Sequence, residues 1–156
     1  MTDTQPVRKS NGGVRIRIGL GATILGFLIY LLGAEPGIFR LDRSPVVGFV
    51  QIATFLVGLG IICLGGYISL AALWNGGQKS IASDIGLRLV STGYVISVAC
   101  GMADIFGFGS NAFPKVPVFG ILQQIGFLFG EAVIGIGLLL LIPYKKPQPE
   151  IGELSS

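Results

Sequence analysis

The stretch Pro45 to Gly65, PVVGFVQIATFLVGLGIICLG, decides the fold, because a second copy follows 72 residues later as Pro117 to Gly137, PVFGILQQIGFLFGEAVIGIG. Aligned without a gap, the two stretches are identical at nine of 21 positions. The identical pairs are Pro45/Pro117, Val46/Val118, Gly48/Gly120, Gln51/Gln123, Phe55/Phe127, Leu56/Leu128, Gly58/Gly130, Ile62/Ile134 and Gly65/Gly137. Most other positions exchange one apolar residue for another. This pattern indicates a duplicated membrane-spanning helix within a duplicated helical hairpin.

Six of the identical positions share one face of the predicted helix. Positions 48, 51, 55, 58, 62 and 65 are separated by 3, 4, 3, 4 and 3 residues, which is the spacing of the a and d positions of a helical seam. Half of these positions carry glycine, namely Gly48, Gly58 and Gly65 in the first copy and Gly120, Gly130 and Gly137 in the second. Small residues let helix backbones approach closely in a bilayer. We therefore predict that both seams pack in the core of a helix bundle.

A glutamine also recurs on the seam, as Gln51 and Gln123. A side-chain hydrogen bond between membrane helices contributes roughly 0.6 to 2 kcal/mol, so one interpretation is that the two amides bond across the helix contact. The other interpretation is that they line a polar path. The neighbouring Gly, Phe and Ile side chains leave little room for water, which favours the first.

The composition is that of an integral membrane protein. The 156 residues fit one domain. Half of them (51%) are hydrophobic and 12% are charged, whereas a soluble domain carries about 25% charged residues. The chain has no His. This excludes a histidine general base, a histidine metal ligand and an axial histidine for haem. Cys63 and Cys100 lie in apolar runs on opposite sides of the expected midplane, so we expect packing residues and no disulfide.

The sequence predicts an all-α membrane domain over 14–142 with four spans, at 14–33, 45–73, 81–109 and 117–142. The polar segments 1–13 and 143–156 are expected to be disordered tails. A cleaved signal peptide is the alternative for the first span, but no small-x-small cleavage site stands out.

The distribution of basic residues predicts the orientation of the spans. Arg8, Lys9, Arg15, Arg17, Lys79, Lys145 and Lys146 lie on the side of the termini, and Arg40, Arg43 and Lys115 lie on the other. Seven basic residues against three place both termini in the cytoplasm. We expect the inner (plasma) membrane of a bacterium. The two halves then share one orientation and are related by a pseudo-twofold axis along the membrane normal. At the same offset of 72, spans 1 and 3 retain only scattered matches, such as Gly21/Gly93 and Ile24/Ile96.

Glu131 is the residue most able to carry function, because ionisable side chains inside a membrane are rare. It lies near the middle of the last span, its counterpart in the first copy is Leu59, and Gln124 lies seven residues earlier on the same face. Three interpretations remain open. Glu131 is a proton, cation or ligand site, or it makes a structural hydrogen bond between helices, or it contacts a partner subunit.

Two other acidic residues lie in the third span. Asp84 precedes Arg88 by four residues, the favourable order for an ion pair on one helix face, and a pair near the membrane surface is the favoured interpretation. Asp104 lies near the outer end of the span, and a salt bridge to Arg40, Arg43 or Lys115 is expected there.

The sequence carries no pattern typical of a catalytic centre. It has no Ser/His/Asp set, no ligand cluster with metal-binding spacing, no phosphate-binding loop between a strand and a helix, and no basic face for nucleic acid. We therefore expect no cofactor and no enzymatic activity, and partners that are the lipid bilayer together with other membrane subunits or further copies of the chain.

Three function hypotheses follow. The favoured one is a small accessory, assembly or regulatory subunit that packs against a larger membrane complex. The alternative is a small homo-oligomeric transporter or channel that uses Glu131 with Gln51, Gln123 and Gln124. A membrane enzyme is the weakest. A Glu131 that faces the bundle interior around a cavity, beside Gln51 or Gln123, favours transport, whereas an outward-facing Glu131 favours a subunit.

Overall fold

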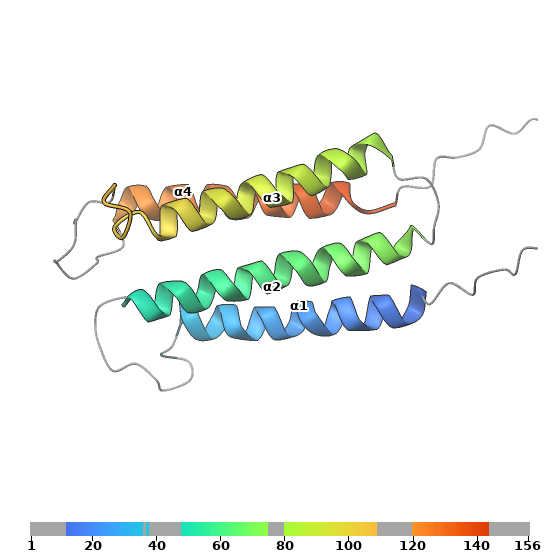
Figure 1. Cartoon of the computed structure of the whole chain (residues 1–156), viewed down its shortest axis with the longest axis horizontal. Coiled ribbons are helices and arrows are strands. Elements are labelled where there is room, and N and C mark those ends of the chain that lie inside the picture. Colours follow the sequence, from blue (N-terminus) through green and yellow to red (C-terminus); the bar gives the residue numbers. More distant parts are fainter. Residues whose placement is uncertain (1–11, 36, 38–47, 75–79, 109–119, 144–156) are drawn as a thin grey trace, which may run out of the picture.

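The computed structural model describes residues 12–35, 37, 48–74, 80–108 and 120–143. In this part of the chain the structure contains four helices, α1 (Gly12–Ala34), α2 (Phe49–Leu73), α3 (Ile81–Gly101) and α4 (Ile121–Leu140). All four are long and apolar enough to cross a membrane, so the predicted all-α, multi-pass fold is confirmed. The helices pack as two antiparallel hairpins, α1 with α2 and α3 with α4 (Figure 1). The predicted tails lie largely outside the described residues.

Three of the predicted spans are longer than the helices that the structure contains. Gly48 is the N-cap of α2, so this helix begins at Phe49 and not at position 45. Gly120 is the N-cap of α4, and its backbone N–H donates to Oε1 of Gln123 at 2.7 Å, so the helix begins at Ile121 and not at position 117. At the other end of the second hairpin, α3 ends at Gly101 and not at position 109. Turns occupy residues 102–107, where Gly107 has a φ of 79°, a conformation that favours glycine.

Two glycine pairs hold α1 against α2. A Cβ atom on Gly26 would lie 2.9 Å from the carbonyl oxygen of Gly58, and one on Gly58 would lie 2.8 Å from that of Gly26. Gly19 and Gly65 have the same reciprocal relation, at 2.8 and 2.7 Å. Side chains do not tolerate such short distances, so only glycine lets these two backbones touch. The backbones gain dispersion contact along the whole crossing.

The second hairpin is built in the same way. A Cβ atom on Gly93 would lie 2.6 Å from the carbonyl oxygen of Gly130, and one on Gly130 would lie 2.7 Å from that of Gly93. Gly86 and Gly137 repeat this relation at 2.6 and 2.7 Å. In every helix the two paired glycines are seven residues apart, which is two helical turns, so they share one face.

The predicted seam glycines therefore fall into two groups. Gly58, Gly65, Gly130 and Gly137 pack against the other helix of their own hairpin. Gly48 and Gly120 lie instead at the N-caps of α2 and α4. The seams of α2 and α4 thus face α1 and α3 over most of their length, and they come together at Phe55 and Phe127.

The glycine contacts also correct the alignment of α1 with α3. Gly19 and Gly26 take the places of Gly86 and Gly93, which is an offset of 67 residues rather than 72. Gly21, the counterpart of Gly93 at offset 72, is exposed, and a Cβ atom there would meet nothing within 4 Å. The matches between α1 and α3 at offset 72, such as Gly21/Gly93, therefore do not pair structurally equivalent residues. The segment that joins the paired helices is five residues longer in the second hairpin.

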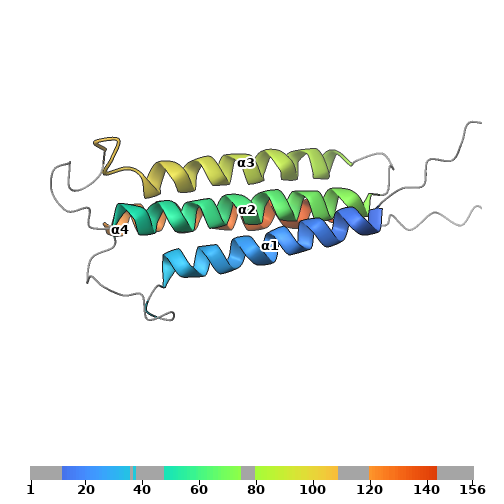
Figure 2. The same cartoon turned by 60° about the horizontal axis from the view of Figure 1, so that its bottom comes forward.

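The two hairpins contact each other mainly through α2, which lies against both α3 and α4 (Figure 2). The buried apolar core consists of Ile52, Phe55, Leu56, Leu59, Cys63, Val90, Phe127, Ile134 and Leu141. At the end near the termini, the indole N–H of Trp74 donates to the carbonyl oxygen of Leu141 at 3.0 Å. Both cysteines are free, Cys63 in this core and Cys100 half-buried.

Replacement of a paired glycine should destabilise the fold. We expect Gly58→Ala and Gly130→Ala each to lower the free energy of unfolding by about 1–3 kcal/mol, because the added methyl group forces two backbones apart. Reversible unfolding of the purified chain in mixed detergent micelles, followed by circular dichroism, measures the change. Gly135→Ala is the matched control on α4, because its Cβ atom would meet nothing within 4 Å. Paired-glycine variants as stable as this control would contradict the packing argument.

Candidate functional site

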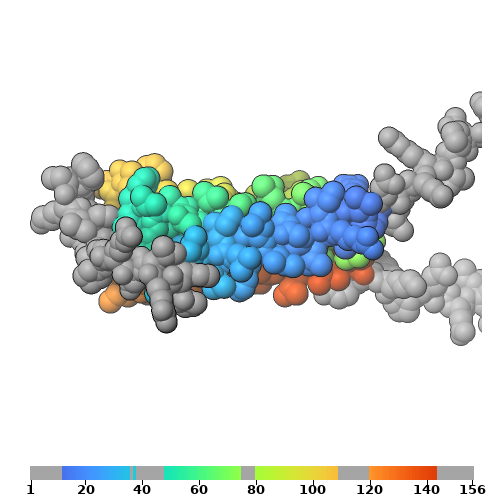
Figure 3. Space-filling model, turned by 90° about the horizontal axis from the view of Figure 1, so that it is seen from below, coloured from blue at the N-terminus to red at the C-terminus, as the bar shows by residue number. Residues whose placement is uncertain are grey.

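A cavity of about 440 Å³ lies between the two hairpins, and residues from α1, α2 and α4 line it. The lining residues are Tyr30, Gly33, Ala34, Glu35, Gln51, Phe55, Gln124, Phe127, Leu128 and Glu131. Glu35 follows the end of α1, and Gln51 and Gln124 lie in the first turns of α2 and α4. All three helix ends lie at the end of the bundle opposite the termini (Figure 1). Figure 3 shows α1 across one face of the molecule, with α2 and α4 visible on either side. We call this cavity the vestibule.

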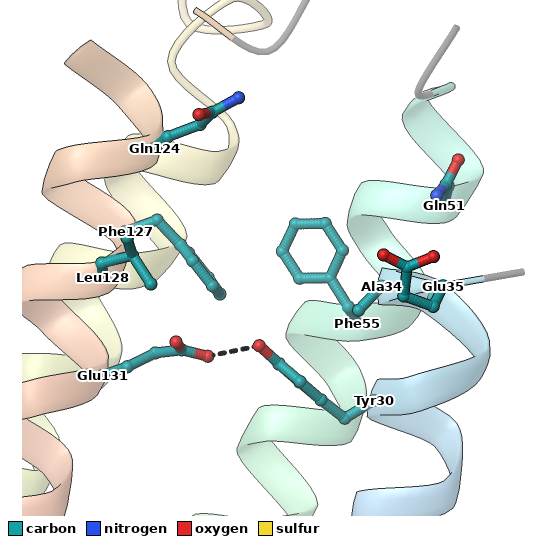
Figure 4. A pocket seen from close by; sticks show the side chains of 10 residues that line it. Tyr30, Ala34, Glu35, Gln51, Phe55, Gln124, Phe127, Leu128 and Glu131 are labelled. Atoms are coloured by element: carbon teal, nitrogen blue, oxygen red, sulfur yellow. Dashed lines mark hydrogen bonds between the residues drawn. The ribbon is translucent and has the colours of Figure 1, made fainter. Parts of the chain in front are cut away.

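A hydrogen bond between the two hairpins forms the deep end of the vestibule. The hydroxyl group of Tyr30 on α1 donates to Oε1 of Glu131 on α4 at 2.6 Å (Figure 4). Both residues are half-buried. Glu131 lies ten residues after Ile121, roughly 15 Å along the axis, so its carboxyl group lies near the middle of the span. A short O–H···O bond of this kind is a strong one when the acceptor is a carboxylate.

Aromatic rings form the middle of the vestibule. Phe55 and Phe127, which occupy equivalent positions in the two copies of the repeat, pack edge to face with ring centroids 5.1 Å apart and an angle of 70°. Tyr30 contacts Phe55 in the same manner at 6.4 Å and 69°. In Figure 4 the two Phe rings lie between the Tyr30–Glu131 pair and the glutamines. The rings thus lie between the glutamines and Glu131 along the axis of the bundle (Figure 4).

The open end of the vestibule is polar. Gln51 and Gln124 lie on opposite walls, on α2 and α4, and Glu35 is exposed beyond the last turn of α1 (Figure 4). The vestibule thus has a polar entrance, an aromatic middle and a carboxyl group at its base. Among the described residues that line it, two are acidic and none is Lys or Arg.

Gln123 lies outside the vestibule, although it was predicted to share the site. It is 6% exposed, and its carbonyl oxygen accepts the backbone N–H of Gly120. Gln123 is the third residue of α4, the position from which a Gln side chain reaches back to the N-cap. Its Nε2 atom has no hydrogen-bond partner in the described part of the chain. Gln123 therefore closes the first turn of α4, while Gln51 lines the vestibule.

Sequence reasoning did not find Tyr30, the aromatic pair or Glu35 as parts of this site. Tyr30 lies four residues after Gly26 and so shares its side of α1. Tyr30 could have been predicted on chemical grounds, because a carboxyl group in an apolar span needs a hydrogen-bond donor from another helix. Tyr30 is the one phenol in the first span.

The predicted ion pair lies away from the vestibule, near the termini. Arg88 Nη2 is 3.2 Å from Asp84 Oδ2, and both side chains are mostly exposed. Asp104 lies in the turn after α3 and is buried. The partners expected for it, Arg40, Arg43 and Lys115, lie outside the described residues.

The described residues contain no group of three Cys, Asp or Glu side chains that could hold a metal ion. Comparison with protein-family models, with curated proteins and with solved structures found no match for this chain. The functional interpretation therefore rests on the geometry and chemistry of the vestibule.

The Tyr30–Glu131 bond should couple the two hairpins energetically. Tyr30→Phe and Glu131→Gln are combined in a double-mutant cycle, with unfolding free energies measured in mixed micelles. We expect a coupling of about 0.6–2 kcal/mol, the range for hydrogen bonds between membrane helices. Tyr94→Phe is the control, since its hydroxyl group makes a long bond of 3.4 Å to the carbonyl oxygen of Leu56. Strictly additive effects of the two site variants would show that the bond does not tie the hairpins together.

Proposed function

We propose that the chain is a small non-enzymatic membrane transporter that passes a cation or a proton by way of Glu131. The observation that carries this proposal is the position of Glu131. Its carboxyl group is half-buried near mid-span, hydrogen-bonded to Tyr30 of the other hairpin, at the base of a cavity that also contains Gln51 and Gln124. Ionisable side chains that line a cavity within a membrane are typical of ion and substrate pathways.

In this proposal Glu131 is reached from the end opposite the termini, which favours transport over a static channel. On the side of the termini, α2 contributes Leu59 and Cys63 to the buried apolar core, to which Ile134 of α4 also belongs. Trp74 adds its bond to Leu141 at that end. A transporter that exposes its site alternately to the two sides passes through such a one-sided state. In this proposal the two hairpins rock against each other and move the access from one end to the other.

Duplication of a hairpin accounts for the symmetry of the proposed transporter. In addition to the seam of α2 and α4, residues 18–20 and 85–87 are both Ile-Gly-Leu at the offset of 67. Two copies in one orientation give a pseudo-twofold axis along the membrane normal. Phe55 and Phe127, equivalent in the two copies and in contact, would lie beside that axis. Because Leu59 replaces the acid in the first copy, the chain carries one such carboxyl group.

The orientation proposed for the chain makes the vestibule face outward. The excess of basic residues on the terminal side supports a cytoplasmic position for both termini, in the proposed bacterial inner membrane. The vestibule, at the opposite end, then opens to the periplasm or the exterior. Gln51 and Gln124 would replace part of the hydration of an entering cation, and Glu131 would bind it. Assembly into a homo-oligomer is part of this proposal.

Glu131→Gln should abolish transport while preserving the shape of the site. Purified chain is reconstituted in liposomes, and proton and sodium fluxes are measured with entrapped dyes under an imposed potential. We expect wild-type flux for at least one of these ions and a loss of at least tenfold in Glu131→Gln. Asp84→Asn removes an exposed carboxylate at the other end of the bundle and should leave the flux unchanged. Equal flux of both ions in wild type and Glu131→Gln would rule out the proposed role of Glu131.

A second candidate function, an accessory or assembly subunit of a larger membrane complex, is favoured by the outer face of α3. Asp84, Arg88, Ser91 and Thr92 are all exposed on this helix. Snorkelling toward the membrane surface accounts for the ion pair near the helix start. It does not account for Ser91 and Thr92, which lie near mid-span, although the Ser91 hydroxyl group donates to the carbonyl oxygen of Leu87 on its own helix at 3.1 Å. A polar face in the bilayer is typical of a contact with another membrane helix.

The two functions differ in the complex that the chain forms. Purification of the tagged chain from its native membrane in mild detergent, with the mass of the intact complex, tests the subunit function. A larger partner in fixed stoichiometry, lost in a variant with Ser91→Leu and Thr92→Leu, is the result expected of an accessory subunit. A homo-oligomer without other chains would contradict it.

A further inference from the structure

The ligand class of the vestibule follows from the side chains that line it, provided that the vestibule is the binding site of the proposed function. Three aromatic rings line it in a row, because the Phe55 ring packs edge to face against Tyr30, at 6.4 Å between centroids, and against Phe127, at 5.1 Å. Because neighbouring rings are set at steep angles, the cluster presents both ring edges and ring faces. A ring face attracts a cation within about 6 Å of its centroid.

The charged groups of the vestibule point to the same sign of ligand. Glu131 lies at the base and Glu35 at the entrance, and none of the described lining residues is basic. The N-termini of α2 and α4 at the entrance favour anions, but this effect is small and is confined to the first turn of each helix. Two carboxyl groups at two depths outweigh it, so a cationic ligand is expected.

A metal cation fits this lining less well than an organic cation does. Metal ions such as sodium, magnesium and calcium need several oxygen ligands at once, but the oxygen atoms here are divided between the entrance and the base by the two Phe rings. A volume of about 440 Å³ also lies in the range of sites for small organic molecules. A cation with apolar substituents matches the aromatic middle, since it is weakly hydrated and contacts ring faces directly.

We infer that the vestibule binds a small organic ammonium ion, with its charge on Glu131 and its alkyl groups among Tyr30, Phe55 and Phe127. The Tyr30 hydroxyl group occupies one acceptor site of Oε1. A carboxylate has about four such sites, so the ammonium ion pairs with Glu131 while Tyr30 holds its orientation. Glu35 attracts the ion to the entrance.

A matched pair of probes tests this inference on the full chain in detergent. Choline and its neutral isostere 3,3-dimethylbutan-1-ol differ in the replacement of the charged nitrogen by carbon. Isothermal titration calorimetry measures the binding of both, with sodium chloride as the inorganic control. We expect choline to bind at least tenfold more tightly than the isostere, which corresponds to about 1.4 kcal/mol, and sodium to compete only weakly. Equal binding of choline and its isostere would overturn the inference.

The variants separate the charge from the aromatic wall. Glu131→Gln should weaken choline binding at least tenfold and remove the preference over the isostere. Phe127→Leu should weaken choline by severalfold with less effect on the isostere, because it removes a ring face. Glu35→Gln changes an exposed side chain, so the fold should be kept, and it should weaken choline binding more at low salt than at high salt. Asp84→Asn is the control and should bind choline as wild type does. Choline binding that is unchanged in Glu131→Gln and in Glu35→Gln would also overturn the inference.

The ligand class and the proposed transport can fail separately. Proton or sodium flux that depends on Glu131, without binding of choline, would overturn the ligand class and leave the transport proposal standing. Choline binding that depends on Glu131, in a protein that passes no cation in liposomes, would support the ligand class and contradict transport.

Discussion

The fold depends on the direct contact of helix backbones at four glycine pairs. A bilayer supplies no hydrophobic drive between apolar helices, so their association relies on dispersion contact and polar bonds. In the pairs Gly26/Gly58 and Gly93/Gly130, the carbonyl oxygen of each glycine lies too close to its partner for the partner to carry a Cβ atom. Each hairpin is therefore a tightly packed unit. Contacts between the hairpins are different in kind, since they involve larger side chains, such as Phe55 against Phe127 and Leu56 against Gly101. The vestibule lies between the hairpins, where no glycine pairs close the gap.

Much of the fold could be predicted from the sequence, because membrane spans and a repeated glycine seam are strong local signals. The number of spans and the burial of the seam of α2 and α4 follow from hydropathy and from the period of the repeat. The relation of α1 to α3 could not be found at offset 72, because five additional residues precede α4. An insertion between two helices leaves the spacing of residues within each helix unchanged. It changes the sequence offset between the two copies, here from 67 to 72 residues. The prediction that α4 begins at position 117 was wrong, because Gln123 caps the helix at Gly120.

The candidate site was predicted in part. Glu131 and Gln124 stood out because polar side chains are rare in apolar spans, and both line the vestibule. Tyr30 and Glu35 could not be assigned to the site, since α1 and α4 are far apart in the sequence and the repeat relates neither residue to Glu131. Gln51 and Gln123 are identical in the repeat but differ in role, because one lines the vestibule and the other caps a helix. The repeat thus predicted which helix face carries each glutamine, but it did not predict what the side chain contacts.

Trp74 is the one tryptophan of the chain, and it lies where the two hairpins meet near the termini. Its indole N–H donates to the carbonyl oxygen of Leu141, so the bond spans the boundary between the halves of the molecule. A separation of the hairpins at this end would break that bond and expose the indole ring to lipid headgroups or water. The protein therefore carries a built-in fluorescent reporter of its own conformation, read without labels and at a distance from the residues of the vestibule.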